Sequence, residues 1–258
     1  MILDGYRGSI AHNLHIPREA DDVFGVDDVD YFSIYTYPLN YYLSLESYNH
    51  AGEVIDQKIE ESDTVQYAIH KAFHLLAQCN PNILSFLYNR PEHYVKISEG
   101  GRMLLENRSV FLAARRIRDA FAGYAYAQLR KLTEGSYKGY MGDRRKNVVD
   151  KYGYDTKNAA TLVRLLRQGI ELLTTGELIT YRVDDRDFLL SIKVGQFTLS
   201  QVQEMADKEF KKLDAAYDNT KLPKENNRAT INALLVDILR LEYRMEALPT
   251  KKVLRNAA

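Results

Sequence analysis

The sequence has little cysteine, no tryptophan and no excess of charge of either sign. Its 258 residues include one cysteine and no tryptophan, and 35 basic side chains balance 35 acidic ones. The single Cys79 excludes an internal disulfide, and its position in an apolar run favours a buried thiol over a nucleophile. A protein that coats duplex DNA needs a basic excess, so the balanced charge argues against that class. It leaves room for a local basic patch.

Long apolar runs are also missing. No run reaches the roughly 18 residues that suggest a membrane span, so we expect no membrane association. The first residues, MILDGYRGS, lack the apolar segment of a signal peptide, and we therefore expect a cytoplasmic protein. The hydrophobic content of 45% supports a real core, and the length allows one large domain or two small ones.

The first third of the chain reads as a mixture of strands and helices. Residues 2–6 predict a short strand, and residues 28–36 alternate in a way that predicts a second one. Residues 66–79 carry apolar side chains at helical spacing, and the segment Asn80-Pro81-Asn82 predicts the end of that helix. Residues 53–60 favour a strand or turn.

The remainder of the chain predicts mostly helices. Helical periodicity covers residues 108–133, 156–175 and 228–247. Ser200 and Gln203 match a capping box that would open a further helix. The glycine-rich residues 134–154 suggest a flexible connection, and residues 178–183 suggest a strand. We therefore predict an α+β protein, with a small mixed-sheet core at residues 1–95 and an α-helical C-terminal domain at residues 96–258.

Two short motifs indicate chemistry near the N-terminus. Gly8 and Ser9 form a turn in which glycine lets the backbone approach a phosphate closely and serine adds a hydroxyl. Asp28 and Asp30 are two residues apart on a predicted strand, so their side chains face the same side. Paired carboxylates of this kind suit Mg²⁺, although an isolated Asp-x-Asp is more often a solvated turn. Asp63 could be a third ligand or a helix N-cap, and the residues alone leave both open.

Three blocks of sequence, in order, resemble a known superfamily. The first comprises Gly8-Ser9-Ile10-Ala11-His12, Asp27-Asp28-Val29-Asp30 and Pro38-Leu39-Asn40-Tyr41-Tyr42-Leu43; the others are residues 63–88 and 152–176. They resemble the DNA polymerase β-type nucleotidyltransferases, and most closely the RNA-ligase-associated predicted nucleotidyltransferases of the phage-encoded branch. The resemblance spans about residues 2–200, and a phage origin would place the protein in the host cytoplasm. Two departures are the long run between Ser9 and Asp28, and Ser33 where the family usually has glycine.

The resemblance implies roles for individual residues. Asp28 and Asp30 would bind two Mg²⁺ ions, with Mn²⁺ as a substitute, and Asp63 would bind one of them and help deprotonate the acceptor. The nucleotide-binding residues would be Gly8, Ser9, His12, Lys157 and Arg164. Without the resemblance, Lys157 and Arg164 read as a solvated cationic helix face, and His12 as a structural hydrogen-bonding residue. The basic residues Arg144, Arg145 and Lys146 suit either a nucleic-acid backbone or an ordinary surface.

These assignments predict a Mg²⁺-dependent nucleotidyltransferase that moves a nucleoside monophosphate from an NTP to a hydroxyl. An RNA 3′ end, particularly that of tRNA, is the first candidate for the acceptor, and a small molecule or a protein hydroxyl remains open. The alternative is a non-catalytic nucleotide- or RNA-binding regulator that kept the fold. Three clustered carboxylates argue against that alternative, because a binder gains little from them without metal. The sequence does not indicate the preferred NTP or the oligomeric state.

Overall fold

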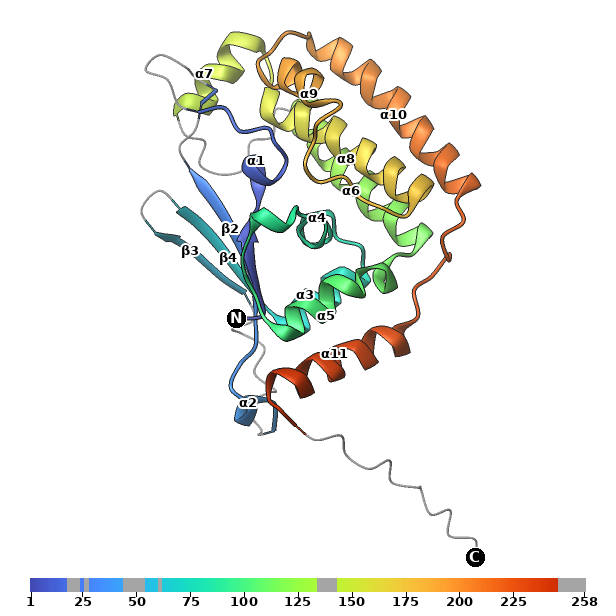
Figure 1. The fold of residues 1–258 in the computed structure, drawn as a ribbon. Coiled ribbons are helices and arrows are strands. Elements are labelled where there is room, and N and C mark those ends of the chain that lie inside the picture. The colour runs from blue at the N-terminus through green and yellow to red at the C-terminus, as the bar shows by residue number, and fades with distance from the viewer. Residues whose placement is uncertain (18–23, 26–27, 44–53, 60–61, 134–142, 246–258) are drawn as a thin grey trace, which may run out of the picture.

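A computed structural model describes residues 1–17, 24–25, 28–43, 54–59, 62–133 and 143–245. Much of the long run between Ser9 and Asp28 lies outside these ranges. The sheet lies on one side of the molecule and most of the helices lie on the other (Figure 1). No helix in the described ranges is long and apolar enough to span a membrane. The mixed sheet combined with a largely helical remainder confirms the predicted α+β class.

The sheet has five strands in the order β3-β4-β2-β1-β5. They are β1 (Leu3–Tyr6), β2 (Val29–Tyr35), β3 (Val54–Ile59), β4 (Ser62–Ala68) and β5 (Tyr94–Ile97). The strands β2 and β4 are parallel, and the other neighbouring pairs are antiparallel. In the β2–β4 register Asp30 lies opposite Asp63. The alternation that predicted a strand at residues 28–36 is therefore confirmed to within a residue at each end.

The helix predicted for residues 66–79 begins later than expected. Residues Gln66 to Ala68 end β4, where they pair with β2, and the helix α3 covers Ile69–Ala77. The periodicity placed the helix start too early because the backbone groups of these residues form hydrogen bonds with the partner strand. The local sequence does not show that pairing. The interruption after α3 is confirmed. The Asn80 side chain accepts a hydrogen bond from the backbone N–H of Asn82 and so caps the next helix, α4 (Pro81–Leu87).

The rest of the chain is helical, as predicted, with corrections to individual elements. Two helices are very short: α1 (Gly8–Ala11) and α2 (Leu39–Leu43). The later ones are α5 (Glu99–Glu106), α6 (Ala114–Thr133), α7 (Asp143–Tyr152), α8 (Thr156–Thr175), α9 (Arg186–Lys193), α10 (Leu199–Asn219) and α11 (Arg228–Glu242). Short 3-10 helices cover Pro91–His93 and Arg108–Phe111.

Three predictions in the helical part were wrong. Thr198 and Gln201 form the capping box of α10, two residues before the predicted pair. Residues 178–183 form no strand, because the Arg182 and Thr180 backbones bond to His12 rather than to a strand. The predicted flexible connection contains the helix α7, whose glycine-free sequence DRRKNVVDKY supports a helix.

The helix α8 lies at the centre of the helical part, between α6 and α10 (Figure 1). Its buried face and the inner face of the sheet contribute to one continuous apolar core, which extends from Ile2 to Ile238. The strand β5 spans the predicted boundary at residue 95, and α11 packs against α3 and α5. The division at residue 95 thus stays a prediction, and the two parts share a core.

Candidate functional site

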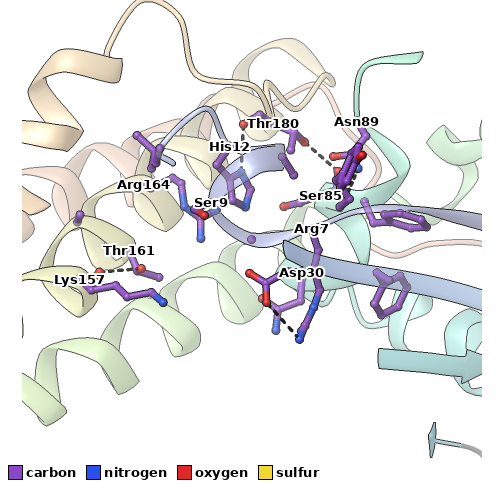
Figure 2. Close-up of a pocket in the computed structure, with 18 of the residues that line it drawn as sticks. Arg7, Ser9, His12, Asp30, Ser85, Asn89, Lys157, Thr161, Arg164 and Thr180 are labelled. Atoms are coloured by element: carbon purple, nitrogen blue, oxygen red, sulfur yellow. Dashed lines mark hydrogen bonds and ion pairs between the residues drawn. The ribbon is translucent and has the colours of Figure 1, made fainter. Parts of the chain in front are cut away.

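A cavity of about 260 Å³ lies where the sheet meets the helical part. Its walls come from the β1–α1 turn, β2, α4 and the residues after it, α8, and the segment around Thr180. Six residues singled out from the sequence line it: Gly8, Ser9, His12, Asp30, Lys157 and Arg164. Figure 2 shows the labelled members of this set around one space. Residues separated by more than 150 positions in the chain are therefore brought together.

The acidic residues lie at the N-terminal ends of two interior strands, β2 and β4. Asp30 and Asp63 occupy the same register on neighbouring parallel strands, and Asp28 is exposed immediately before β2. Asp63 lies within a strand, so the helix N-cap alternative is wrong. Arg7, which the sequence reasoning missed, places its Nη2 atom 2.9 Å from Asp63 Oδ2 and 3.8 Å from Asp30 Oδ1. Its position directly before Gly8-Ser9 was the one available signal.

The pKa of Asp30 reflects these neighbours. Burial raises it above the ordinary value, the positive charges of Arg7 and Lys157 oppose that rise, and Asp63 and Asp28 add to it. The three carboxylates are therefore close enough to influence one another electrostatically. A positive charge between them offsets their repulsion, and Arg7 supplies one.

The fit of a metal ion can be judged from these donors. As arranged, with Arg7 between Asp30 and Asp63, no three His, Cys, Asp or Glu side chains in the described ranges form a group that could hold a metal. The donors are nevertheless carboxylate oxygens, the ligand type that Mg²⁺ takes. The guanidinium contact shows that Asp30 and Asp63 already attract one cation. The carboxylates are therefore ligands of the kind that Mg²⁺ binds. Arg7 would have to leave its contact with Asp30 and Asp63 for a metal ion to bind there.

Gly8 has a structural role in addition to the one expected. Its φ of +65° lies in the left-handed region, which favours glycine. A Cβ atom there would lie 2.1 Å from Asp30 Oδ2. The missing side chain therefore lets the Asp30 carboxylate pack directly against the backbone of the turn. The expected close approach of a phosphate to Gly8 stays a prediction.

Gly8→Ala should damage the site through this contact. The new methyl group would displace the Asp30 carboxylate, and the left-handed backbone would add strain on the order of 1 kcal/mol. We expect a lower melting temperature and at least a tenfold loss of the nucleotide transfer that the sequence predicts. Thermal unfolding and a transfer assay would measure both, with Gly123→Ala as the control, because a Cβ at Gly123 meets nothing within 4 Å. Wild-type behaviour of Gly8→Ala would contradict this reading of the turn.

The helix α8 contributes two cations that differ in environment. Lys157 lies exposed in its first turn, and its amino group points toward Asp30 in Figure 2. Arg164 is only 9% exposed. Its Nη1 atom donates to Gln168 Oε1 over 2.7 Å, and no carboxylate in the described ranges forms an ion pair with it. Burial, with the nearby Arg182 charge, lowers the pKa of Arg164 to about 10.

The start of α8 is fixed by an acidic cap. The buried Asp155 side chain accepts a hydrogen bond from the backbone N–H of Asn158, with the nitrogen 3.0 Å away. Arg145 binds the same Asp155 carboxylate and also donates to Asn158 Oδ1 over 2.9 Å. Between the two readings left open for this basic residue, the structure gives Arg145 a role in holding α7 to α8. The Arg144 side chain lies outside the described residues.

His12 connects the β1–α1 turn to the helical part. Its Nδ1 atom lies 3.1 Å from the Thr180 carbonyl oxygen, to which it can only donate. Burial and then the Arg164 charge hold the pKa of His12 well below 6.5. The ring is therefore neutral at pH 7. The structure supports the structural hydrogen bond, and a phosphate or ribose contact stays a prediction.

Four more cavity residues escaped the sequence reasoning. Asn82, Ser85 and Asn89 come from α4 and the turn after it, and Lys193 comes from the end of α9. The Lys193 amino group donates to the Leu14 carbonyl over 2.6 Å. The segment Asn80-Pro81-Asn82 predicts a helix stop and belongs to the block 63–88 that carries the family resemblance, but it predicts no site residue, although its polar side chains were the available signal.

Comparison with known proteins identifies the chain's relatives at the family level. A family model described as the RNA repair pathway DNA polymerase beta family matches residues 23–237. This match covers most of the chain, including Asp28, Asp30, Asp63 and the helix α8. No curated protein matches.

Proposed function

The chain belongs to the RNA repair pathway DNA polymerase beta family, and on that premise we propose that it transfers a nucleoside monophosphate from an NTP to a hydroxyl group. The acceptor hydroxyl would lose its proton with the help of Asp63 as its oxygen attacks the α-phosphorus. The bond from that phosphorus to the β-phosphate oxygen would break, and pyrophosphate would leave. The family supports a polymerase β-type nucleotidyltransferase. The metal dependence, the substrate and the acceptor are part of the proposal.

The observation that carries the proposal is the buried charge of Arg164. An ionised side chain removed from water costs several kcal/mol unless an opposite charge compensates. In the described ranges Arg164 has an amide oxygen as a partner but no carboxylate, and it lines the same cavity as Asp30. An anionic ligand in the cavity would supply the missing charge, and a guanidinium suits a phosphate because it can donate two parallel hydrogen bonds.

The chain's residues take roles that follow from their positions. Lys157 and Arg164 would bind the phosphates and offset the charge on the leaving pyrophosphate. Ser9 and the backbone of Gly8 would hold the β- and γ-phosphates, and Asp63 would orient the acceptor hydroxyl. Asp28, Asp30 and Asp63 would hold Mg²⁺. Bound there, Mg²⁺ would supply charge stabilisation for the α-phosphate and the leaving group.

A hydroxyl at an RNA 3′ end is the acceptor that the family description favours, since it refers to an RNA repair pathway. The alternative remains a nucleotide- or RNA-binding regulator without transfer activity. The contact of Arg7 with Asp30 and Asp63 is the observation that favours it, because a protein cation already occupies the place between those carboxylates. A competent enzyme has to exchange that contact for metal.

One assay separates the two functions. The purified protein would be incubated with each α-³²P-labelled NTP, Mg²⁺ and total RNA, with and without EDTA. We expect label on RNA, release of pyrophosphate, and loss of both with EDTA. The same assay with small-molecule and protein acceptors would cover the other hydroxyls. If NTPs bind and no acceptor becomes labelled, the regulator is the better conclusion.

Lys157→Gln should weaken NTP binding without destabilising the protein. Lys157 is exposed in the first turn of α8, where a positive charge opposes the helix dipole, so its removal should cost the fold little. Charge-assisted hydrogen bonds contribute about 1.5–3 kcal/mol, which predicts a loss of affinity of roughly 10- to 100-fold. Calorimetric titration with an NTP is the measurement, and Lys211→Gln on α10 is the control. Unchanged affinity with a lower melting temperature would make Lys157 a structural residue.

A further inference from the structure

The cavity has two chemically different walls. The wall from α8 is cationic, with Lys157 and Arg164. The opposite wall comes from α4 and the turn after it, and it is uncharged: it presents two amides, a hydroxyl and an aromatic ring, from Asn82, Asn89, Ser85 and Phe86. Figure 2 shows Lys157 and Arg164 at one end and Ser85 and Asn89 at the other. A ligand that fills both ends needs an anionic part and a neutral, hydrogen-bonding part.

Two atoms on the uncharged wall have no hydrogen-bond partner among the residues that the structure describes. They are Ser85 Oγ and Asn89 Oδ1, and the two residues are only 5% and 8% exposed. Leaving a buried polar atom unsatisfied costs about 1–3 kcal/mol, and such atoms in native proteins call for an explanation. Both residues line the cavity, so a ligand there is an available partner.

The surrounding hydrogen bonds fix how these groups are presented. The Asn89 Nδ2 atom donates to the Tyr6 carbonyl oxygen over 2.7 Å, so the amide cannot rotate to exchange its oxygen and nitrogen without losing that bond. The Ser85 carbonyl oxygen accepts from Thr180 Oγ1 over 2.8 Å, which holds the backbone in place. Asn89 Oδ1 is therefore a preorganised acceptor, and the Ser85 hydroxyl can donate or accept.

These requirements select the kind of group that binds. Asn89 Oδ1 can only accept, so its partner must carry an N–H or an O–H. The oxygens of a fully ionised phosphate have no proton to donate, and this end of the cavity therefore suits a different part of the ligand. The Phe86 ring beside Ser85 offers apolar contact. A nucleoside combines an apolar ring face with N–H and O–H donors.

We propose that Ser85 and Asn89 form the nucleoside subsite, in which they hydrogen-bond an N–H or O–H group of the NTP while Lys157 and Arg164 hold its phosphates. This inference rests on the proposed function and adds the residues that bind the uncharged part of the substrate. The donor belongs either to the base or to the ribose, and both present the same chemistry to Asn89 Oδ1.

Ser85→Ala is the sharpest test, because the Ser85 hydroxyl has no partner in the described part of the chain. Its removal breaks no internal hydrogen bond, so the melting temperature should stay the same or rise. The affinity for NTPs, measured calorimetrically, should fall about three- to tenfold, the value of one neutral hydrogen bond. The affinity for inorganic tripolyphosphate, which has no nucleoside, should not change.

Ser191→Ala is the matched control. The Ser191 hydroxyl lies outside the cavity and donates to the Phe188 carbonyl over 2.6 Å. Its loss should lower the melting temperature and leave both affinities unchanged. A titration series with ATP, dATP and the other NTPs would assign the donor. An effect of Ser85→Ala that is absent with dATP indicates the ribose, and one that varies among the four NTPs indicates the base.

Other outcomes overturn the proposal. If Ser85→Ala binds every NTP as tightly as the wild type, the unsatisfied atoms hold only a buried water and the subsite assignment fails. Tripolyphosphate binding by the wild type would then still support the cationic, phosphate-binding end of the cavity and the proposed function. If the wild type binds neither NTP nor tripolyphosphate, the proposed function fails together with the subsite.

Discussion

Asp30→Asn should abolish nucleotide transfer while the protein stays folded. Asparagine has nearly the same shape as aspartate. It can therefore fill the space against the Gly8 backbone that the Asp30 carboxylate occupies. It cannot supply the negative charge that a metal ion requires at this position. We expect a loss of at least about a thousandfold in rate, which corresponds to about 4 kcal/mol in the barrier.

The measurement is the labelled-NTP transfer assay, combined with circular dichroism and a melting curve. The melting temperature should change little, because the Arg7 Nη2 atom lies 3.8 Å from Asp30 Oδ1 but 2.9 Å from Asp63 Oδ2. Asp237→Asn on α11, an exposed carboxylate far along the chain, is the control. Transfer within about threefold of the wild type, only ~0.6 kcal/mol, would exclude Asp30 as a catalytic residue.

Arg164→Met should produce the second largest effect, on binding rather than on folding. Methionine replaces a buried cation with an apolar side chain of similar reach, and such replacements are often neutral or stabilising. The lost hydrogen bond to Gln168 offsets part of that gain, so we expect a melting temperature close to that of the wild type. Affinity for NTP and for tripolyphosphate should fall by roughly 10- to 100-fold, the value of a charge-assisted hydrogen bond.

Arg164→Lys separates charge from geometry. Lysine keeps the charge but cannot donate two parallel hydrogen bonds, so affinity should recover only in part. Arg240→Met, at an exposed ion pair on α11, is the control. A large drop in melting temperature with unchanged anion affinity would show that Arg164 stabilises the fold and would remove the main support for an anionic ligand.

Much of the fold was predictable because it depends on local periodicity. The alternation around Asp28 and Asp30 predicted β2, since a strand with one buried face repeats every two residues. The spacing of Lys157 and Arg164 predicted a shared helix face, since residues near multiples of 3.6 align. The three ordered blocks predicted the family, which the match over residues 23–237 confirms.

The errors arose where backbone partners come from distant segments. Residues 66–68 lie at the start of the helix predicted from the spacing of Ile69, Phe73 and Leu76, yet they belong to β4 because the parallel strand β2 pairs with them. Residues 178–183 look like a strand, yet they lie against the β1–α1 turn through His12. Short segments adopt whichever arrangement forms hydrogen bonds with their backbone groups. A partner more than 150 residues away cannot be predicted from the local sequence.

The sequence by itself determined most of the element types and the order of the motifs, and it supplied the residues proposed as catalytic, because each depends on side-chain chemistry or on spacing within one element. Only the tertiary structure decided that Arg7 lies between Asp30 and Asp63, that Arg164 is buried in the described fold without a carboxylate partner, and that Ser85 and Asn89 face the cavity. Those facts depend on how β1, α4 and α8 pack. Burial and partner choice are properties of the packed molecule, and they set the charges and hydrogen bonds that a ligand meets.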